Sequence, residues 1–226
     1  MVTATIADTA VSDLVGSSPL LDANGNNAFT ITITSGDAEA TAANLTSLYG
    51  KTSVAVDASA VTQITGTVAE ANIVYAAGAS EITGLGNETV VATESTLADV
   101  TALNTLDDNT TGTVNAGSIT SVTGTLAKLL TTYGSNGITG LGNEAIAVSD
   151  TVTLAASDLN SLDSKTSGTV TTSTSLGTLT GTVASLNTAY GSAGLSIEGD
   201  EAITISDITV DAEALNNLNN YTTGVI

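Results

Sequence analysis

The apolar residues of this chain follow two spacings in turn along most of its length. Short stretches rich in Val, Ile and Thr are typical of β-strands, and each is followed by a stretch with apolar residues at positions i and i+3, the spacing of a short helix. One strand and one helix therefore form the expected structural unit. Strands are predicted at residues 2–6, 29–34, 53–56, 89–93, 113–116, 145–149, 168–172 and 202–206.

The helical stretches begin after residue types that cap helices. Gly50, Gly134 and Gly191 follow three of these stretches directly, at the place where a left-handed residue commonly ends a helix. Each stretch spans two to three turns, which is too short for a stable helix in water, so the helices must pack on their neighbours. Helices are predicted at residues 42–49, 126–133, 183–190 and 212–218, with Asp37, Thr125, Thr182 and Asp211 as their N-caps.

Whole segments of the sequence recur with one period. Residues 82–88 return at 138–144 and, in degenerate form, at 195–201, a step of about 56 residues each time. A Leu-Asn-x-Leu segment recurs in the same phase at residues 103, 159 and 215. Two strand–helix units fit one such period, so each unit has about 28 residues. Eight units are predicted to open at Val2, Ala28, Ser53, Glu81, Gly112, Gly137, Gly168 and Leu195.

Units of this length bury too little apolar surface to fold alone. We therefore expect an α/β solenoid of about eight coils that share one core, a rod on the order of 40 Å long at about 4.8 Å per coil. Residues 1–40 are expected to form an N-terminal coil or a diverged cap, and residues 41–226 the tandem repeats of one elongated domain. Two alternatives remain open at this point: an all-β solenoid, in which the i, i+3 stretches are not helices, and a tandem of sandwich-like domains.

Charge excludes two classes of partner. The chain has 23 acidic residues, three lysines and neither Arg nor His, for a net charge of −20. Such a surface repels nucleic acid and anionic membranes. A hydrophobic fraction of 42% argues against a disordered acidic tail. The N-terminus lacks the charged and apolar regions of a signal peptide, which suggests a piece of a longer protein or an export signal at the other end.

The residue types argue against an enzyme. Without His, Cys or Arg, the usual general base, thiolate nucleophile and oxyanion clamp are missing. A pair of carboxylates could hydrolyse a glycosidic bond, but the chain has no Trp and one Phe to stack on a sugar. Tyr49, Tyr75, Tyr133 and Tyr190 each end an apolar stretch at what look like equivalent positions, which predicts a role in packing.

Calcium binding is the chemical function that the acidic residues still allow. In stacked coils, the Asn-Glu or Asp-Glu pairs that end at residues 88, 144 and 201 would form a column about 10 Å apart. The alternative is a solvated acidic face, because two charges at this distance repel by only about 0.4 kcal/mol in water. No cofactor is required in either case. The candidate calcium ligands are Glu88, Glu144, Glu201, Asp200, Asp107 and Asp108.

Two further motifs are interpreted as turns. Residues 22–26 have the oxygen spacing of an EF-hand loop, but Ile33 stands where the loop needs a bidentate Glu. The glycine pairs at residues 84–86 and 140–142 are followed by β-type residues and not by a helix, so they predict corners of the fold and not a phosphate-binding loop.

The two ends of the sequence lack a polar capping unit, which repeat proteins need for solubility. Residues 224–226 stop where a strand should begin, and residues 2–6 look like its continuation. We therefore expect self-association, either with neighbouring repeats of a longer chain or head to tail with further copies.

Residues 155–163, 166–170 and 137–144 resemble repeats of very large, acidic, Thr-rich surface proteins of marine cyanobacteria and other aquatic bacteria. The resemblance covers most of residues 40–226 and implies an extracellular, adhesin-like or matrix role without catalytic residues. The sequence as a whole predicts a non-catalytic structural repeat of an extracellular or cell-surface protein, a stiff spacer or a head-to-tail filament component. A calcium- or glycan-binding adhesin module is the alternative.

Overall fold

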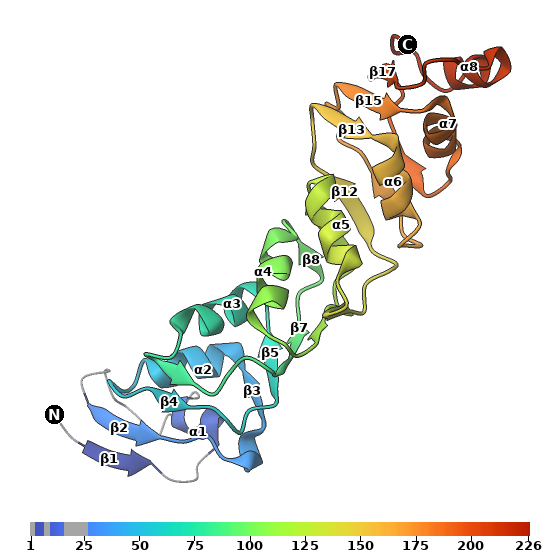
Figure 1. Cartoon of the computed structure of the whole chain (residues 1–226). Coiled ribbons are helices and arrows are strands. Elements are labelled where there is room, and N and C mark those ends of the chain that lie inside the picture. The colour runs from blue at the N-terminus through green and yellow to red at the C-terminus, as the bar shows by residue number, and fades with distance from the viewer. Residues whose placement is uncertain (1–2, 7–9, 16–26) are drawn as a thin grey trace. The chain divides into compact units, whose positions relative to one another are not determined.

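A computed structural model describes residues 3–6, 10–15 and 27–226 of the chain. The chain forms two compact blocks, each of which is described by itself (Figure 1). The first block comprises residues 1–94, 102–118 and 136–140, and the second comprises residues 95–101, 119–135 and 141–226. Val2, where the first strand was expected to begin, and the EF-hand-like residues 22–26 lie outside the described residues.

Strands and helices alternate in both blocks. The first block contains β1 (Thr3–Ile6), α1 (Val11–Val15), β2 (Ala28–Ile31), a 3-10 turn (Ser35–Asp37), β3 (Glu39–Thr41), α2 (Ala42–Tyr49), β4 (Val56–Asp57), β5 (Gln63–Gly66), α3 (Val68–Ala77), β6 (Ile82–Thr83), β7 (Thr89–Ala92), most of α4 (Thr101–Asn109), β9 (Val114–Asn115) and β11 (Ile138–Thr139). The second contains β8 (Thr96–Leu97), β10 (Ser121–Gly124), α5 (Leu126–Gly134), β12 (Ala145–Val148), β13 (Thr153–Ala155), α6 (Ala156–Asp163), β14 (Val170–Thr171), β15 (Thr178–Gly181), α7 (Val183–Gly191), β16 (Leu195–Ser196), β17 (Ala202–Ile205) and α8 (Ala212–Asn219).

Each strand pairs in parallel with a strand from a neighbouring unit. In the first block the order β3-β5-β7-β9-β11 brings one apolar residue from each strand into a single row, and all five residues are buried. In the second block the order β16-β14-β12-β10-β8 aligns a similar row. The rows are Ala40, Ile64, Val90, Val114 and Ile138 in the first block and Leu97, Val122, Ile146, Val170 and Leu195 in the second.

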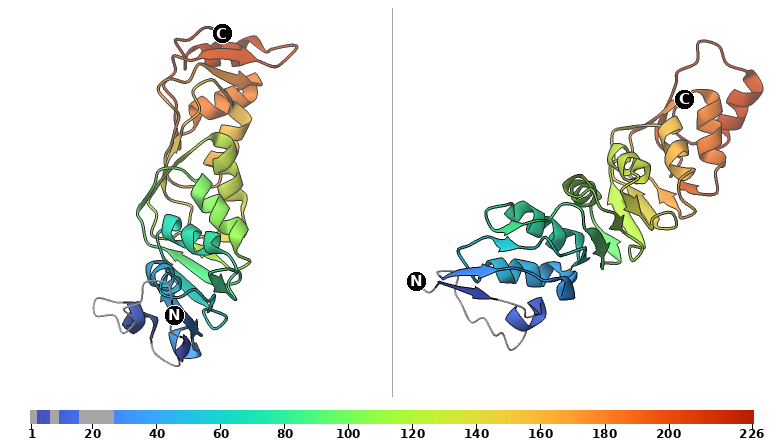
Figure 2. Two further views of the ribbon diagram at one scale, coloured as in Figure 1. Left: turned by 90° about the vertical axis from the view of Figure 1, so that its left-hand side faces the viewer. Right: turned by 60° about the horizontal axis from the view of Figure 1, so that its bottom comes forward.

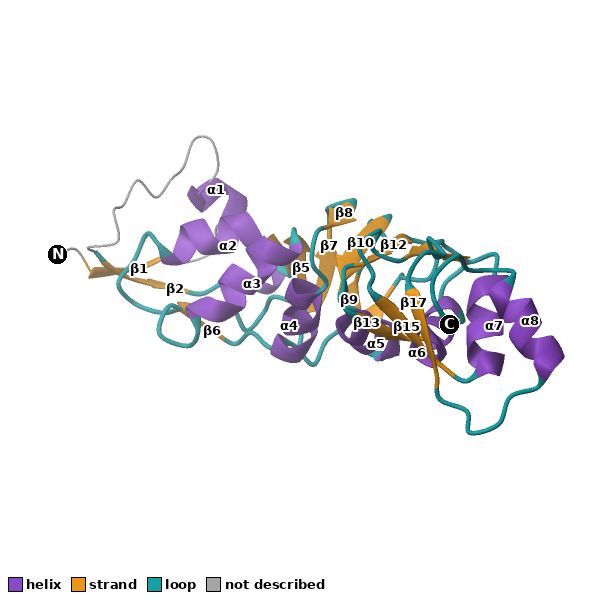
Figure 3. Cartoon of the chain, turned by 90° about the horizontal axis from the view of Figure 1, so that it is seen from above, coloured by secondary structure: helices purple, strands orange, loops and turns teal. Residues whose placement is uncertain are grey.

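The helices lie beside these strands (Figure 3). In the first block α2 contacts α1 and α3, and in the second block α6 contacts α5 and α7. In the second block α6, α7 and α8, drawn in orange to red, lie side by side (Figure 2). Ala42, Leu45 and Leu48 of α2 are fully buried, as the i, i+3 pattern predicts. The described residues thus form eight α-helices in an α/β repeat fold, and the all-β alternative is wrong because the i, i+3 stretches are helices.

The expectation of one strand per helix is wrong. Every predicted strand region contains a strand, although residues 53–56 contribute only Val56. Further strands that were not predicted lie directly before the helices, among them β5, β10 and β15. These strands are four residues long and end in glycine, so their composition alone does not mark them as strands.

Helix ends differ from expectation at both termini. Thr125, Thr182 and Asp211 are confirmed as N-caps, but α2 is capped by Thr41, whose hydroxyl accepts from the Asn44 N–H at 3.1 Å, and not by Asp37. The glycines at 134 and 191 are the last helical residues of α5 and α7, and Gly50 has a φ of −66°. The left-handed ending predicted for all three is wrong, because none of the three glycines has a positive φ.

Candidate functional site

Each long repeat carries one glutamate inside the fold. Glu88 and Glu144 have no exposed surface and Glu201 has 3%. Each glutamate directly precedes a strand, β7, β12 or β17, and follows a glycine turn. The interpretation of these residues as part of a solvated acidic face is therefore wrong. Their side chains turn inward because the protein itself supplies hydrogen-bond donors for the carboxylate.

The donors of Glu144 come from a helix and from a turn. The Gly142 N–H donates to both carboxylate oxygens, at 2.9 Å to Oε1 and 2.8 Å to Oε2. The hydroxyl of Tyr133, in the last turn of α5, donates to Oε2 at 2.7 Å. One carboxylate thus ties the end of a helix to the turn before the next strand.

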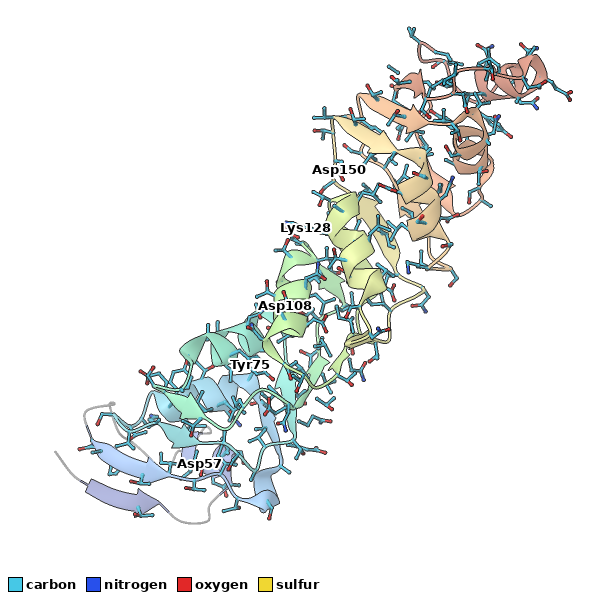
Figure 4. The ribbon with its side chains drawn as sticks, viewed as in Figure 1. Asp57, Tyr75, Asp108, Lys128 and Asp150 are labelled. Atoms are coloured by element: carbon cyan, nitrogen blue, oxygen red, sulfur yellow. The ribbon has the colours of Figure 1, made fainter. Side chains whose placement is uncertain are left out.

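The same tie occurs in the first block. The Gly86 N–H lies 3.0 Å and 2.8 Å from the two oxygens of Glu88, and the Tyr75 hydroxyl donates to Oε2 at 2.9 Å. Tyr75 extends from α3, as the stick view shows (Figure 4). Since the partners recur at the same positions of the repeat, the contact is a property of the repeat and not of one site.

The last repeat keeps the tie and adds an aromatic contact. Glu201 accepts from the Tyr190 hydroxyl and, at 3.1 Å, from the Gly199 N–H. The ring of Tyr190 also stacks on Tyr221, with centroids 6.0 Å apart and planes 6° from parallel. Tyr221 follows α8, so this pair joins the ends of two neighbouring helices.

Burial favours the neutral form of these phenols. Loss of solvent raises the pKa of Tyr75, Tyr133 and Tyr190 well above the usual value of 10, and the adjacent glutamate raises it further. Each tyrosine therefore keeps its proton at neutral pH, and its hydroxyl donates a hydrogen bond to the carboxylate. A hydrogen bond of this type, to a charged acceptor, contributes about 1.5–3 kcal/mol.

The next unit packs closely against the backbone of each glutamate. A Cβ on Gly112 would lie 2.1 Å from the Glu88 carbonyl oxygen, so only glycine fits there. The buried Thr110 hydroxyl donates to the same carbonyl at 3.2 Å and accepts from the Gly112 N–H at 3.0 Å. The corresponding glycines at 168 and 224 would clash with residues 144 and 201 in the same way. A Thr-Gly or Ser-Gly pair recurs in the sequence at residues 111–112, 167–168 and 223–224, and the glycine of each pair makes this contact between consecutive units.

Three other acidic residues accept a hydrogen bond from the first turn of the helix in the preceding unit. Such a contact satisfies a free N–H of the first helical turn and places negative charge at the positive end of the helix dipole. The acceptors are Glu94 for Val68 N of α3 at 2.8 Å, Asp150 for Leu126 N of α5 at 2.7 Å, and Asp207 for Val183 N of α7 at 2.7 Å.

The remaining candidate calcium ligands are not part of these hydrogen-bonded contacts. Asp108 is exposed on α4, and Asp200 is exposed beside Glu201. Asp107 lies against the next unit, where a Cβ on Gly137 would come within 2.0 Å of its Oδ1. In the part of the chain that the structure describes, no three side chains of His, Cys, Asp or Glu come together in a group that could hold a metal ion.

Sequence reasoning missed the Glu–Tyr tie although a signal for it exists. Tyr75, Tyr133 and Tyr190 each precede their glutamate by 11 to 13 residues, so the two residue types recur in one phase. Tyr49 was grouped with these tyrosines wrongly. It ends α2, whose Leu45 and Leu48 correspond to the leucine pairs of α4 and α6, helices that end in other residues.

An open hollow of about 470 Å³ lies beside α7 and α8 in the second block. It is lined by two exposed asparagines, by an exposed tyrosine, and by Asn187, whose side-chain amide donates to the Ala214 carbonyl at 2.9 Å. Amide groups and an aromatic face are suited to hydrogen bonding and stacking with a polar ring such as a sugar. The lining residues are Asn187, Ala214, Asn217, Asn220 and Tyr221.

Comparison with protein-family models, with curated proteins and with solved structures finds no match for this chain. Among the described residues, no helix has both the length and the apolar character needed to cross a lipid bilayer. The recurring contacts between consecutive units are therefore the basis for the functional argument.

Proposed function

We propose that this chain is a non-catalytic structural repeat of an extracellular or cell-surface protein, a stiff spacer whose strand–helix units wind as an α/β solenoid. The observation that carries the proposal recurs in three successive long repeats. In each, a buried glutamate accepts hydrogen bonds from a tyrosine hydroxyl and from a glycine N–H. The hydrogen-bond donors to each buried carboxylate come from the chain itself, as expected for a residue with a structural role. Because consecutive units contact each other through the same interface, further units can be added without any change in that interface.

The surface chemistry supports a place outside the cell. A net charge of −20 keeps a long array soluble and discourages binding to nucleic acid and anionic membranes. The resemblance of residues 137–144, 155–163 and 166–170 to repeats of large acidic bacterial surface proteins points the same way. Its partners are neighbouring repeats of a longer chain or further copies of itself, and it requires no cofactor.

Insertion of extra repeats tests the spacer directly. Chains with one and two additional copies of residues 103–158 should show a maximum dimension in small-angle scattering that increases by at least about 10 Å per copy, two strand spacings. A particle that grows equally in all directions would contradict the proposal.

The melting temperature should be the same in EDTA and in the presence of calcium. A melting temperature that is higher in calcium would favour the calcium-binding adhesin module that the acidic residues also suggested.

Glycan binding is a second candidate, because the hollow beside α7 and α8 offers two exposed asparagines, Asn217 and Asn220, and the exposed Tyr221. Isothermal titration with soluble oligosaccharides should then give heat with the unmodified chain and none with Asn217→Ala. The exposed Glu198→Ala, outside the hollow, is the control. Absence of heat with every oligosaccharide class tested would leave the spacer as the sole function proposed.

A further inference from the structure

The three long repeats differ at one position beside the glutamate-bound tyrosine. This position directly precedes the threonine whose hydroxyl accepts a hydrogen bond from the glycine N–H at the contact between units. Asn109 occupies it in the first repeat, Lys165 in the second and Tyr221 in the third. Because the contacts on both sides of the position recur, the three side chains stand at equivalent places in the fold and can be compared directly.

In the third repeat an aromatic ring fills the space beside the tyrosine. Tyr221 stacks on Tyr190 with ring centroids 6.0 Å apart and planes 6° from parallel. Parallel, offset rings at this separation attract each other beyond the area that they bury. The hydroxyl of Tyr190 is bonded to Glu201, so the ring on which Tyr221 stacks is held in one orientation. The repeat therefore contains its own example of a second ring bound beside the glutamate-bound tyrosine.

In the first repeat a hollow lies beside the corresponding tyrosine. It has a volume of about 250 Å³ and lies among the end of α3, the turn after β6 and the end of α4. Tyr75, labelled in Figure 4, and Asn109 both line it, and all of its lining residues belong to the first block. An apolar cavity of about 150 Å³ is enough to bind benzene. The hollow therefore has room for one substituted aromatic ring.

The chain after α3 explains why this space is open. Tyr75 precedes Glu88 by 13 residues, whereas the tyrosines of the other two repeats precede their glutamates by 11. The two extra residues lie between α3 and β6, where Gly78 has a φ of 64°. Gly78 and Ala79 line the hollow, and nothing lies within 4 Å of a Cβ built on Gly78. Small residues in the longer loop and the short side chain of Asn109 thus leave the space unfilled.

The walls of the hollow have the chemistry of a small-molecule site. Val74, with no exposed surface, and Ile82, with 4%, supply apolar surface, and Asn109 supplies an exposed amide. The Tyr75 hydroxyl donates to Glu88 at 2.9 Å, so its ring is fixed before any ligand arrives and stacking on it costs little ordering. Apolar walls with a few polar groups and a fixed aromatic ring are typical of ligand sites.

We propose that this hollow binds a small molecule through a single aromatic ring, which stacks on Tyr75 in the way that Tyr221 stacks on Tyr190. The ring carries no negative charge, because the chain has a net charge of −20 and Tyr75 lies beside the Glu88 carboxylate. The site adds ligand binding to the structural role. It belongs to the first block, whereas the hollow beside α7 and α8 belongs to the second.

An NMR titration of the whole chain with p-cresol tests the proposal. This probe has the ring and hydroxyl of a tyrosine side chain and is uncharged at neutral pH. The backbone amide signals of Gly78, Ala79 and Gly84, which line the hollow, should shift and saturate with a Kd of about 1 mM or tighter. Methylcyclohexanol, of similar size but without an aromatic ring, should bind about two- to tenfold more weakly because it cannot stack.

Two variants that fill the hollow should weaken the binding of p-cresol. Asn109→Tyr places a ring where Tyr221 has one, at an exposed position. Ala79→Leu adds a larger side chain at another exposed wall, and tests the proposal even if the first variant does not fold. The matched control is Lys165→Tyr, the same new side chain at the equivalent exposed position of the second repeat, which should bind p-cresol like the unmodified chain.

The outcomes separate the aromatic site from the structural role. Absence of saturable shifts, equal affinity for p-cresol and methylcyclohexanol, or a folded filling variant that binds like the unmodified chain would each overturn the site. Loss of binding in Lys165→Tyr would also overturn it, because the effect would then not be local to the first repeat. None of these results affects the lengthening of the particle with inserted repeats, which tests the spacer itself.

Discussion

Glu88, Glu144 and Glu201 show how a polar residue can specify contacts inside a repeat made mostly of small residues. A buried carboxylate is costly unless donors surround it, and here a tyrosine hydroxyl and a backbone N–H converge on it. Because the donors must be in place for the glutamate to be buried, the residue selects one arrangement of helix and turn. An apolar residue at the same position would fill space without this requirement.

Removal of the Glu144 carboxylate tests this role. Glu144→Ala should lower the free energy of unfolding by about 2–4 kcal/mol, because it leaves the Tyr133 hydroxyl and the Gly142 N–H without their acceptor. Tyr133→Phe should cost about 1–3 kcal/mol. The exposed Glu198→Ala is the control and should change stability by less than about 0.5 kcal/mol. Equal effects in urea unfolding at residues 144 and 198 would contradict a structural role for Glu144.

Alkaline pH should destabilise the fold through the same tyrosines. Their pKa values are raised in the folded chain by burial and by the adjacent glutamate, whereas in the unfolded chain they ionise near the ordinary value of 10. The stability they contribute is thus fully present below about pH 10 and is lost as the pH rises further. Tyr133→Phe should reduce the slope of stability against pH in this range by about a third. An unchanged slope in urea titrations would show that Tyr133 does not contribute.

At the scale of the elements, the sequence predicted the helices that depend on the local pattern of apolar and capping residues. Residues 42–49, 126–133 and 183–190 are helical because apolar residues recur every three to four positions after a capping threonine. The buried glutamates were not predicted, since burial depends on a tyrosine 11 to 13 residues earlier and on a turn whose shape the sequence does not display. The short strands before the helices were missed because pairing with the next unit, and not composition, makes them strands.

Two glycines near helix ends have opposite roles, which a pair of alanine substitutions can separate. Gly134→Ala should stabilise the chain by about 0.5–1 kcal/mol, because this last residue of α5 is helical and nothing lies within 4 Å of the added methyl group. Gly168→Ala should cost about 3 kcal/mol or more, since its Cβ would lie 1.9 Å from the Glu144 carbonyl oxygen. Thermal melts that rank the two variants in the other order would contradict the contact between units described here.

At the scale of the whole molecule, the sequence repeats with a period of about 56 residues. The strand register advances by one unit at each step of a ladder, and the helices that carry a glutamate-bound tyrosine, α3, α5 and α7, alternate with α4, α6 and α8. A long repeat therefore presents the same two surfaces as the repeats before and after it. If so, removing a whole period should leave every remaining contact between units intact, whereas removing half a period should place two units of one type in succession.

The most direct test is a comparison of two deletions by circular dichroism and urea unfolding. Deletion of residues 103–158 joins Ala102 to Leu159, the counterpart of Leu103, and should give a folded chain that unfolds cooperatively with the spectrum of the full chain. Deletion of residues 103–128 also keeps a leucine after Ala102 but puts a tyrosine helix directly after α3, and should give a chain without a cooperative transition. An unfolded first variant, or two variants that fold equally well, would contradict the repeat on which the proposed function rests.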